Sequence, residues 1–115
     1  MENGVYWRCN GSEPGRETII FVHGLSGSSS AWIPYEQKFG KKFNLLSFDL
    51  RGHGKSVKKI SDGYYAFENI SGDIAALAER FKLQKFVLVG HSLGAILAMD
   101  FARRHKEKIS RLILL

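Results

Sequence analysis

The stretch from Phe86 to Leu97 constrains the fold of this chain more than any other. A short apolar run, FVLV, stops at Gly90, and an amphipathic run begins after Ser92. The first run predicts a buried strand, and the apolar residues of the second recur at helical spacing. The sequence therefore predicts a strand that turns sharply into a helix.

The turn between the two runs has a Gly-x-Ser-x-Gly pattern, Gly90-His91-Ser92-Leu93-Gly94. A nucleophilic serine on such a turn has strained backbone geometry, and side chains two residues to either side would collide as the chain reverses. The turn lifts the hydroxyl clear of the sheet and leaves N–H groups at the helix N-terminus free to bind an oxyanion. We interpret Ser92 as a nucleophile. The alternative is that Ser92 merely caps a helix after a glycine turn.

A second pattern, His23-Gly24-Leu25, directly follows the run TIIFV at 18–22, which predicts a buried strand. If this turn faces the serine, the N–H groups of Leu25 and Leu93 would converge on one oxygen, as acyl transfer requires. The alternative is that Gly24 is only a turn and His23 a buried histidine. Taken alone, the pattern favours this alternative.

A third pattern, DLRGHGKS at 49–56, follows an apolar run that predicts a strand. Its Gly-Lys-Ser ending is similar to a phosphate-binding loop. Such a loop requires a glycine five positions before Gly54, where this chain has Asp49, and it opens a helix, where 57–63 is polar and irregular. The dinucleotide fingerprint also fails, because Val57 occupies the place of its third glycine. Nucleotide binding is therefore disfavoured, and we interpret the segment as a functional or connecting loop.

Strands and helices alternate along the chain. Apolar patterns predict strands at 5–9, 18–22, 43–49, 86–89 and 109–115, and helices at about 30–39, 67–82 and 92–104. This alternation predicts an α/β fold with a mostly parallel sheet and helices on both faces. The chain stops inside an apolar strand, so we expect residues 1–115 to be the N-terminal part of a single domain whose later strands are absent.

The three motifs, in this order and after these strands, resemble the α/β-hydrolase superfamily, specifically its serine-esterase-like members. The resemblance implies that Ser92 is the nucleophile and that Leu25 and Leu93 supply the oxyanion hole through their backbones. Asp49 and Arg51 would support the loop beside the active site. Ser92 stands where relatives that act on epoxides or halides have aspartate, which argues against those chemistries. The other residues of the three motifs are His23, Gly24, Gly52, Gly54, Ser56, Gly90, His91 and Gly94.

The triad of this family runs in the order serine, acid, histidine, so the resemblance places both partners of Ser92 beyond residue 115. His105 follows Ser92 by 13 residues. On one helix these residues would lie roughly 20 Å apart, and Asp100 would lie about 12 Å away. Neither distance allows a hydrogen bond. A cap inserted after the last strand shapes the substrate pocket in relatives, so substrate identity and oligomeric state are not predicted.

Composition bounds the remaining possibilities. The chain has 115 residues, a formal charge of +6 and one cysteine, Cys9. The basic residues are dispersed among acidic ones without interleaved aromatic residues, which favours a solvated surface over nucleic-acid binding. No stretch has the length of a signal peptide's apolar core or of a membrane span. A lone cysteine predicts a reducing, cytoplasmic location, and no cysteine and histidine cluster has the spacing of metal ligands.

The sequence thus predicts a serine hydrolase that acts on a small-molecule carboxylic ester or related acyl substrate without a metal or organic cofactor. Thioesters and carbon–carbon bonds β to a carbonyl are open alternatives. The fragment itself is expected to be nearly inert, because a serine without a general base is a weak nucleophile. The alternative to a serine hydrolase is a protein without this activity, either a catalytically inert fragment or a non-enzymatic binding module on the same scaffold.

Overall fold

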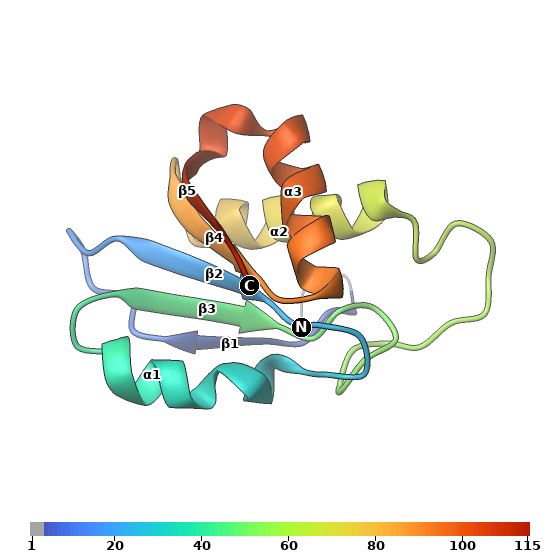
Figure 1. Ribbon diagram of the computed structural model, residues 1–115, viewed down its shortest axis with the longest axis horizontal. Coiled ribbons are helices and arrows are strands. Elements are labelled where there is room, and N and C mark those ends of the chain that lie inside the picture. Colours follow the sequence, from blue (N-terminus) through green and yellow to red (C-terminus); the bar gives the residue numbers. More distant parts are fainter. Residues whose placement is uncertain (1–3) are drawn as a thin grey trace.

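The computed structural model describes residues 4–115, which form a five-stranded sheet with helices on both faces (Figure 1). The strands are β1 (Trp7–Asn10), β2 (Thr18–Val22), β3 (Asn44–Phe48), β4 (Phe86–Gly90) and β5 (Ile109–Leu114). The helices are α1 (Ile33–Phe39), α2 (Phe67–Arg80) and α3 (Leu93–Arg104), with short 3-10 turns η1 (Ser29–Trp32) and η2 (Lys106–Lys108). The α/β fold class predicted from the sequence is confirmed.

The topology brings the ends of three strands together. The strand order is β1-β3-β2-β4-β5, and every neighbouring pair is parallel except the antiparallel pair of β1 and β3. Val22 at the end of β2 lies opposite Phe48 of β3 and Gly90 of β4. Because these strands are parallel, the segments that follow them leave the same edge of the sheet. Each of these segments carries one of the three motifs.

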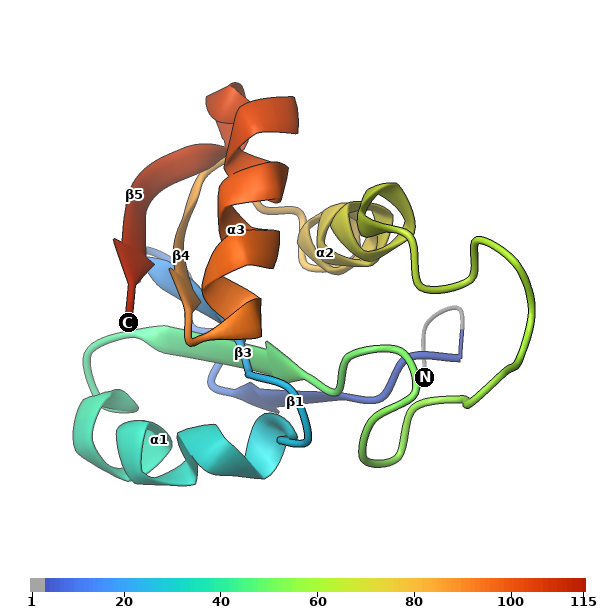
Figure 2. The same cartoon turned by 45° about the vertical axis from the view of Figure 1, so that its right-hand side comes forward.

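Two apolar layers hold the helices to the sheet. On one face, Ile20 and Val22 pack in a core with residues of α2 and α3 such as Ile74 and Phe101. On the other face, Phe21 packs with Trp32 of η1 and residues of the neighbouring strands. This alternation along β2 follows from the period of two in a strand, so the four residues after Thr18, which contact both layers, are all apolar. Figure 2 shows α1 on one side of the sheet and α2 and α3 on the other.

Some boundaries differ from the predicted ones for local reasons. The first strand begins at Trp7 and not at residue 5, since the Tyr6 N–H donates to the Ser56 hydroxyl at 3.0 Å. The helix α2 ends at Arg80, because Lys82 has a φ of 55° and leaves the helical conformation. The segment that begins at about residue 30 is first a 3-10 turn, η1, which Ser28 caps by accepting the N–H of Ser30 with its side chain.

Candidate active site

The backbone at Ser92 is strained. Its φ is 56° and its ψ is −120°, a region that non-glycine residues rarely adopt. Ser92 precedes the first residue of α3, yet its side chain makes no capping hydrogen bond. Its hydroxyl has no hydrogen-bond partner within residues 4–115. Ser92 thus occupies the N-cap position of α3 without capping the helix through its side chain.

Both glycines of the pattern are required by close approach of the backbone. A Cβ on Gly90 would lie 2.6 Å from the carbonyl carbon of Gly94. A Cβ on Gly94 would lie 2.7 Å from the carbonyl carbon of Val22 and 2.6 Å from the carbonyl oxygen of His23. Folded proteins do not contain such contacts, so the start of α3 packs directly against the end of β2 only because side chains are absent.

The turn after β2 lies against the serine. A Cβ on Gly24 would lie 3.2 Å from the Cβ of Ser92 and 3.2 Å from the carbonyl oxygen of His91. The structure therefore brings the His-Gly-Leu motif and the Gly-x-Ser-x-Gly motif together. Within residues 4–115, the backbone N–H groups of Leu25 and Leu93 donate no hydrogen bond. Unbonded N–H groups of this kind are what an oxyanion requires.

His23 is buried and its tautomer is fixed by two hydrogen bonds. Its Nε2 accepts the N–H of Leu50 at 2.9 Å, so Nδ1 carries the proton and donates to the carbonyl oxygen of Gly24 at 2.7 Å. Burial lowers the pKa of the His23 imidazole and outweighs the bond to Gly24, which favours the charged form. His23 is thus a neutral ring that joins the turn after β2 to the segment after β3.

Asp49 anchors the segment after β3. Its carboxylate accepts the N–H of Ser29 at 2.6 Å and that of Lys55 at 2.8 Å. Burial disfavours the charged form, but the N–H donors outweigh it and the pKa of Asp49 is lowered. Gly54 has a φ of 51°, and a Cβ there would lie 2.6 Å from the carboxyl carbon of Asp49. The loop therefore closes tightly around one ionised carboxylate.

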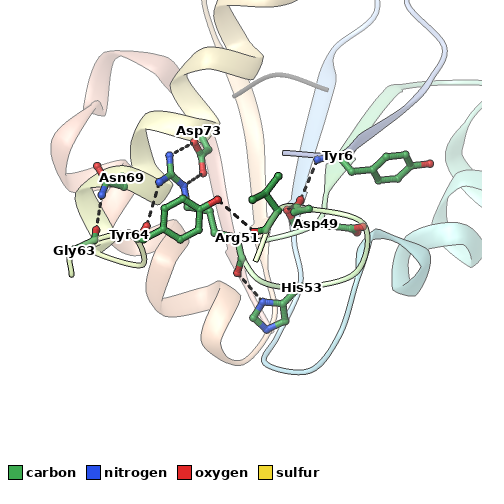
Figure 3. A network of polar contacts seen from close by, with 10 residues as sticks. Tyr6, Asp49, Arg51, His53, Gly63, Tyr64, Asn69 and Asp73 are labelled. Atoms are coloured by element: carbon green, nitrogen blue, oxygen red, sulfur yellow. Dashed lines mark hydrogen bonds and ion pairs between the residues drawn. The ribbon is translucent and has the colours of Figure 1, made fainter. Parts of the chain in front are cut away.

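Arg51 joins the same loop to α2 (Figure 3). Its Nε and Nη2 donate to the carboxylate of Asp73 at 2.7 and 2.9 Å, and its Nη1 donates to the carbonyl oxygen of Tyr64 at 3.1 Å. The Asp73 hydrogen bond raises the pKa of Arg51. Asp73 belongs to none of the three motifs. The sequence does hint at its role, because Asp73 places a carboxylate on the apolar face of α2, three residues after Ile70.

Within residues 4–115, neither His53, His105 nor Asp100 forms a hydrogen bond with Ser92. His53 Nδ1 lies 3.0 Å from the carbonyl oxygen of Arg51, and the ring of His105 stacks on Phe101. Asp100 accepts hydrogen bonds from Ser71, Arg103 and Arg104. Residues 4–115 therefore provide no acid and histidine that are hydrogen-bonded to each other and to Ser92.

Two cavities share Leu25 in their linings. One, of about 390 Å³, is lined by Ser92, His91, Leu25, Trp32 and Tyr35, among others. The second, of about 220 Å³, lies between the loop after β3 and the helices α2 and α3, and Leu25 also lines it.

Within residues 4–115, no group of three or more His, Cys, Asp and Glu residues is placed to hold a metal ion. In the same part of the chain, every helix is too short or too polar to cross a membrane.

Curated relatives cover almost all of this chain. The RutD protein of Rhizobium rhizogenes, whose name describes a carbamate hydrolase, is 33% identical over 102 residues, which are 89% of this chain and 38% of the relative. A RutD protein of Agrobacterium fabrum is 30% identical over the whole chain and 42% of its own length. The chain thus spans about two fifths of the length of these relatives.

Solved structures of hydrolases also match almost all of this chain and about two fifths of their own length. A marine microorganism esterase is 28% identical with a TM-score of 0.84, over 96% of this chain and 40% of its own. The thioesterase domain from a curacin biosynthetic pathway is 27% identical with a TM-score of 0.86, over 96% of this chain and 41% of its own. A family model described as the alpha/beta hydrolase fold matches residues 17–115. The chain belongs to the α/β-hydrolase family.

Proposed function

We propose that this chain carries the nucleophile and the oxyanion hole of a serine hydrolase. The observation that supports this most is the conformation of Ser92, whose strained backbone holds a hydroxyl without a partner within residues 4–115. A strained residue persists only when the surrounding structure enforces it. Here the close approach of Gly94 to the end of β2 enforces it. A serine with only a structural role has no need of this conformation.

In the proposed reaction, the Ser92 oxygen attacks the carbonyl carbon of an acyl substrate. Its proton passes to a histidine, and the negative charge that develops on the carbonyl oxygen is stabilised by the N–H groups of Leu25 and Leu93. The tetrahedral intermediate collapses to an acyl-serine and releases the leaving group, which takes up the proton. Water then hydrolyses the acyl-serine. No step requires a metal or an organic cofactor.

The acid and the histidine are proposed to come from residues beyond Leu115, because the family order is serine, acid, histidine. Without them the serine is a weak nucleophile. Losing one triad member reduces turnover by about 10⁴ to 10⁶ in a protease where this was measured. Residues 1–115 alone are therefore proposed to be nearly inert, as the N-terminal part of a single hydrolase domain.

The proposed substrate is a carboxylic ester or a related acyl compound. Names of similar proteins include a carbamate hydrolase, an esterase, a thioesterase and an enol-lactonase, which all cleave a bond at an acyl carbon.

We also propose a reducing, cytoplasmic location, since Cys9 is the single cysteine and is exposed.

A non-enzymatic binding module is the second candidate. The absence of a base bonded to Ser92 within residues 4–115 favours it, because the cavity beside the serine can bind a ligand without chemistry. This candidate keeps the pocket and lacks the triad.

Reading the coding DNA past the codon for Leu115 and expressing the whole reading frame tests the proposal. We expect an acid after a later strand, a histidine near the end, and hydrolysis of a p-nitrophenyl ester that Ser92→Ala reduces at least 10⁴-fold. Residues 1–115 alone should hydrolyse this ester no faster than their Ser92→Ala variant. A reading frame that stops after Leu115 would favour the binding module. Hydrolysis that survives Ser92→Ala in the whole protein would refute the nucleophile.

A further inference from the structure

The cavity beside Ser92 has an aromatic wall. Trp32 stacks on Phe21 with ring centroids 4.7 Å apart, and the ring of Tyr35 lies 5.4 Å from that of Trp32 and 5.8 Å from that of Phe21. Trp32 is buried, whereas Tyr35 is 38% exposed, and both line the cavity. The half-buried ring of Phe39 also stacks on Tyr35, with centroids 6.5 Å apart, so Tyr35 is the accessible ring between Phe39 and the buried pair of Trp32 and Phe21.

Within residues 4–115, the side chains that line this cavity include no lysine, arginine, aspartate or glutamate. The chain has 17 lysines and arginines and 11 acidic residues, yet within residues 4–115 none of them lines the cavity. The titratable side chains that do line it are Tyr35 and two histidines. His23 is buried with both ring nitrogens hydrogen-bonded, and His91 is the exposed residue next to the serine. A charged ligand group would lose hydration in this cavity without gaining an acidic or basic side chain of residues 4–115 as a partner.

We propose that the cavity binds an uncharged aromatic group of the substrate and that Tyr35 and Trp32 determine this specificity. The inference rests on the proposed function for one point, that the reacting carbonyl lies at Ser92. A planar ring against Tyr35 extends the stack by offset or edge-to-face contact, which contributes about threefold to tenfold in affinity beyond the burial of area. The net charge of +6 would favour anions at the surface, so preference for a neutral ligand is specific to the cavity.

Two probes of nearly the same shape separate these contributions. Methyl benzoate is a neutral aryl ester, and benzoate is the corresponding anion. We expect the protein from the whole reading frame, in its Ser92→Ala variant so that the ester is not hydrolysed, to bind methyl benzoate at least fivefold more tightly than benzoate. The readout is the indole N–H resonance in ¹H–¹⁵N NMR spectra: the signal of Trp32 should shift on titration, and that of Trp7, which packs on Phe81 away from the cavity, should not. Tighter binding of benzoate would overturn the proposal, since surface charge would then govern binding.

Matched variants locate the probe. Tyr35→Ala should weaken methyl benzoate at least threefold, and Tyr35→Phe should leave its affinity within a factor of two, because the ring is retained. The control is Phe67→Ala, which removes a ring of similar exposure, 42%, from the second cavity. It should have no effect. Weakening by Phe67→Ala and not by Tyr35→Ala would place the probe in the second cavity and overturn the proposal.

Ser92→Ala separates this inference from the proposed function. The aromatic wall does not depend on the serine hydroxyl, so the variant should retain methyl benzoate binding. If binding survives but the whole protein shows no hydrolysis that depends on Ser92, the proposed function fails and the specificity of the cavity stands. If hydrolysis depends on Ser92 but methyl benzoate does not shift Trp32, the specificity fails and the proposed function stands.

Discussion

Two segments that leave the same edge of the sheet are held in opposite ways. The turn from Gly90 to Gly94 is fixed by steric packing, with a strained serine whose hydroxyl has no partner within residues 4–115. The loop from Asp49 to Ser56 is fixed by hydrogen bonds: Asp49 accepts two N–H groups, and the Ser56 hydroxyl donates to the carbonyl oxygen of Asp49 at 2.5 Å.

This difference separates stability from chemistry. An unpaired polar group is costly when it is buried, but Ser92 is exposed, so its hydroxyl stays free for a ligand at little cost in stability. The hydrogen-bonded polar groups of the loop from Asp49 to Ser56 stabilise the segment beside the serine turn. We therefore expect changes of volume to disrupt the serine turn, and changes of charge or pH to disrupt the loop.

The largest effect is expected from Gly94→Ala. The added methyl group would overlap the backbone at Val22 and His23, which cannot move without disturbing β2. We expect a loss of about 4 kcal/mol or more in the free energy of unfolding, or no folded protein. Gly72→Ala in α2 is the control, because nothing lies within 4 Å of the new methyl group. It should stabilise the protein by about 0.5 to 1 kcal/mol in urea unfolding. Equal effects of the two changes would contradict the role of packing.

Breaking the pair of Arg51 and Asp73 should come next. Asp73→Asn leaves a largely buried guanidinium without its charged partner, which costs about 3 kcal/mol. Urea unfolding at neutral pH measures the loss. Glu107→Gln is the control, since that carboxylate is exposed and lies 3.9 Å from His105. It should change the stability by less than about 0.5 kcal/mol. A loss below 1 kcal/mol for Asp73→Asn would mean that this pair does not hold the loop.

Asp49 makes the stability of the loop depend on pH. Because its pKa is lowered in the folded protein, its contribution is complete above the unfolded pKa of 3.8 and is lost as the pH falls through the folded pKa. Asp49→Asn should cost about 2 kcal/mol at pH 7, since a neutral amide accepts the two N–H groups less strongly. Unfolding midpoints between pH 7 and pH 2 should converge for the two proteins. Parallel curves would show that Asp49 is not the group responsible.

The smallest effect should come from Ser92→Gly. Glycine adopts a φ of 56° without strain, so the variant should be about 1 kcal/mol more stable than Ser92→Ala, which keeps the strain. Thermal unfolding of the two variants measures the difference. If Ser92→Gly is the less stable of the two, the turn does not store the strain that its backbone indicates.

The sequence predicted the parts of the site that depend on local pattern. Alternating strands and helices implied a parallel sheet, and a parallel sheet puts the segments after β2, β3 and β4 at one edge. The need for glycine at 90 and 94 followed from the reversal of the chain alone. The partners of Arg51 and Asp49 were not predicted, because Asp73 and Ser29 are about 20 residues away in the sequence and no local period links them. The aromatic wall also depends on the packing of α1 against β2, which a single sequence does not specify.

The central claim is that Ser92 is the nucleophile, and covalent labelling tests it most directly. The protein from the whole reading frame is treated with a fluorophosphonate, which reacts with activated serines, and its peptides are analysed by mass spectrometry. We predict one adduct, on the peptide that contains Ser92, and none in the Ser92→Ala variant. Ester hydrolysis by a protein that remains unlabelled at Ser92 would contradict the account.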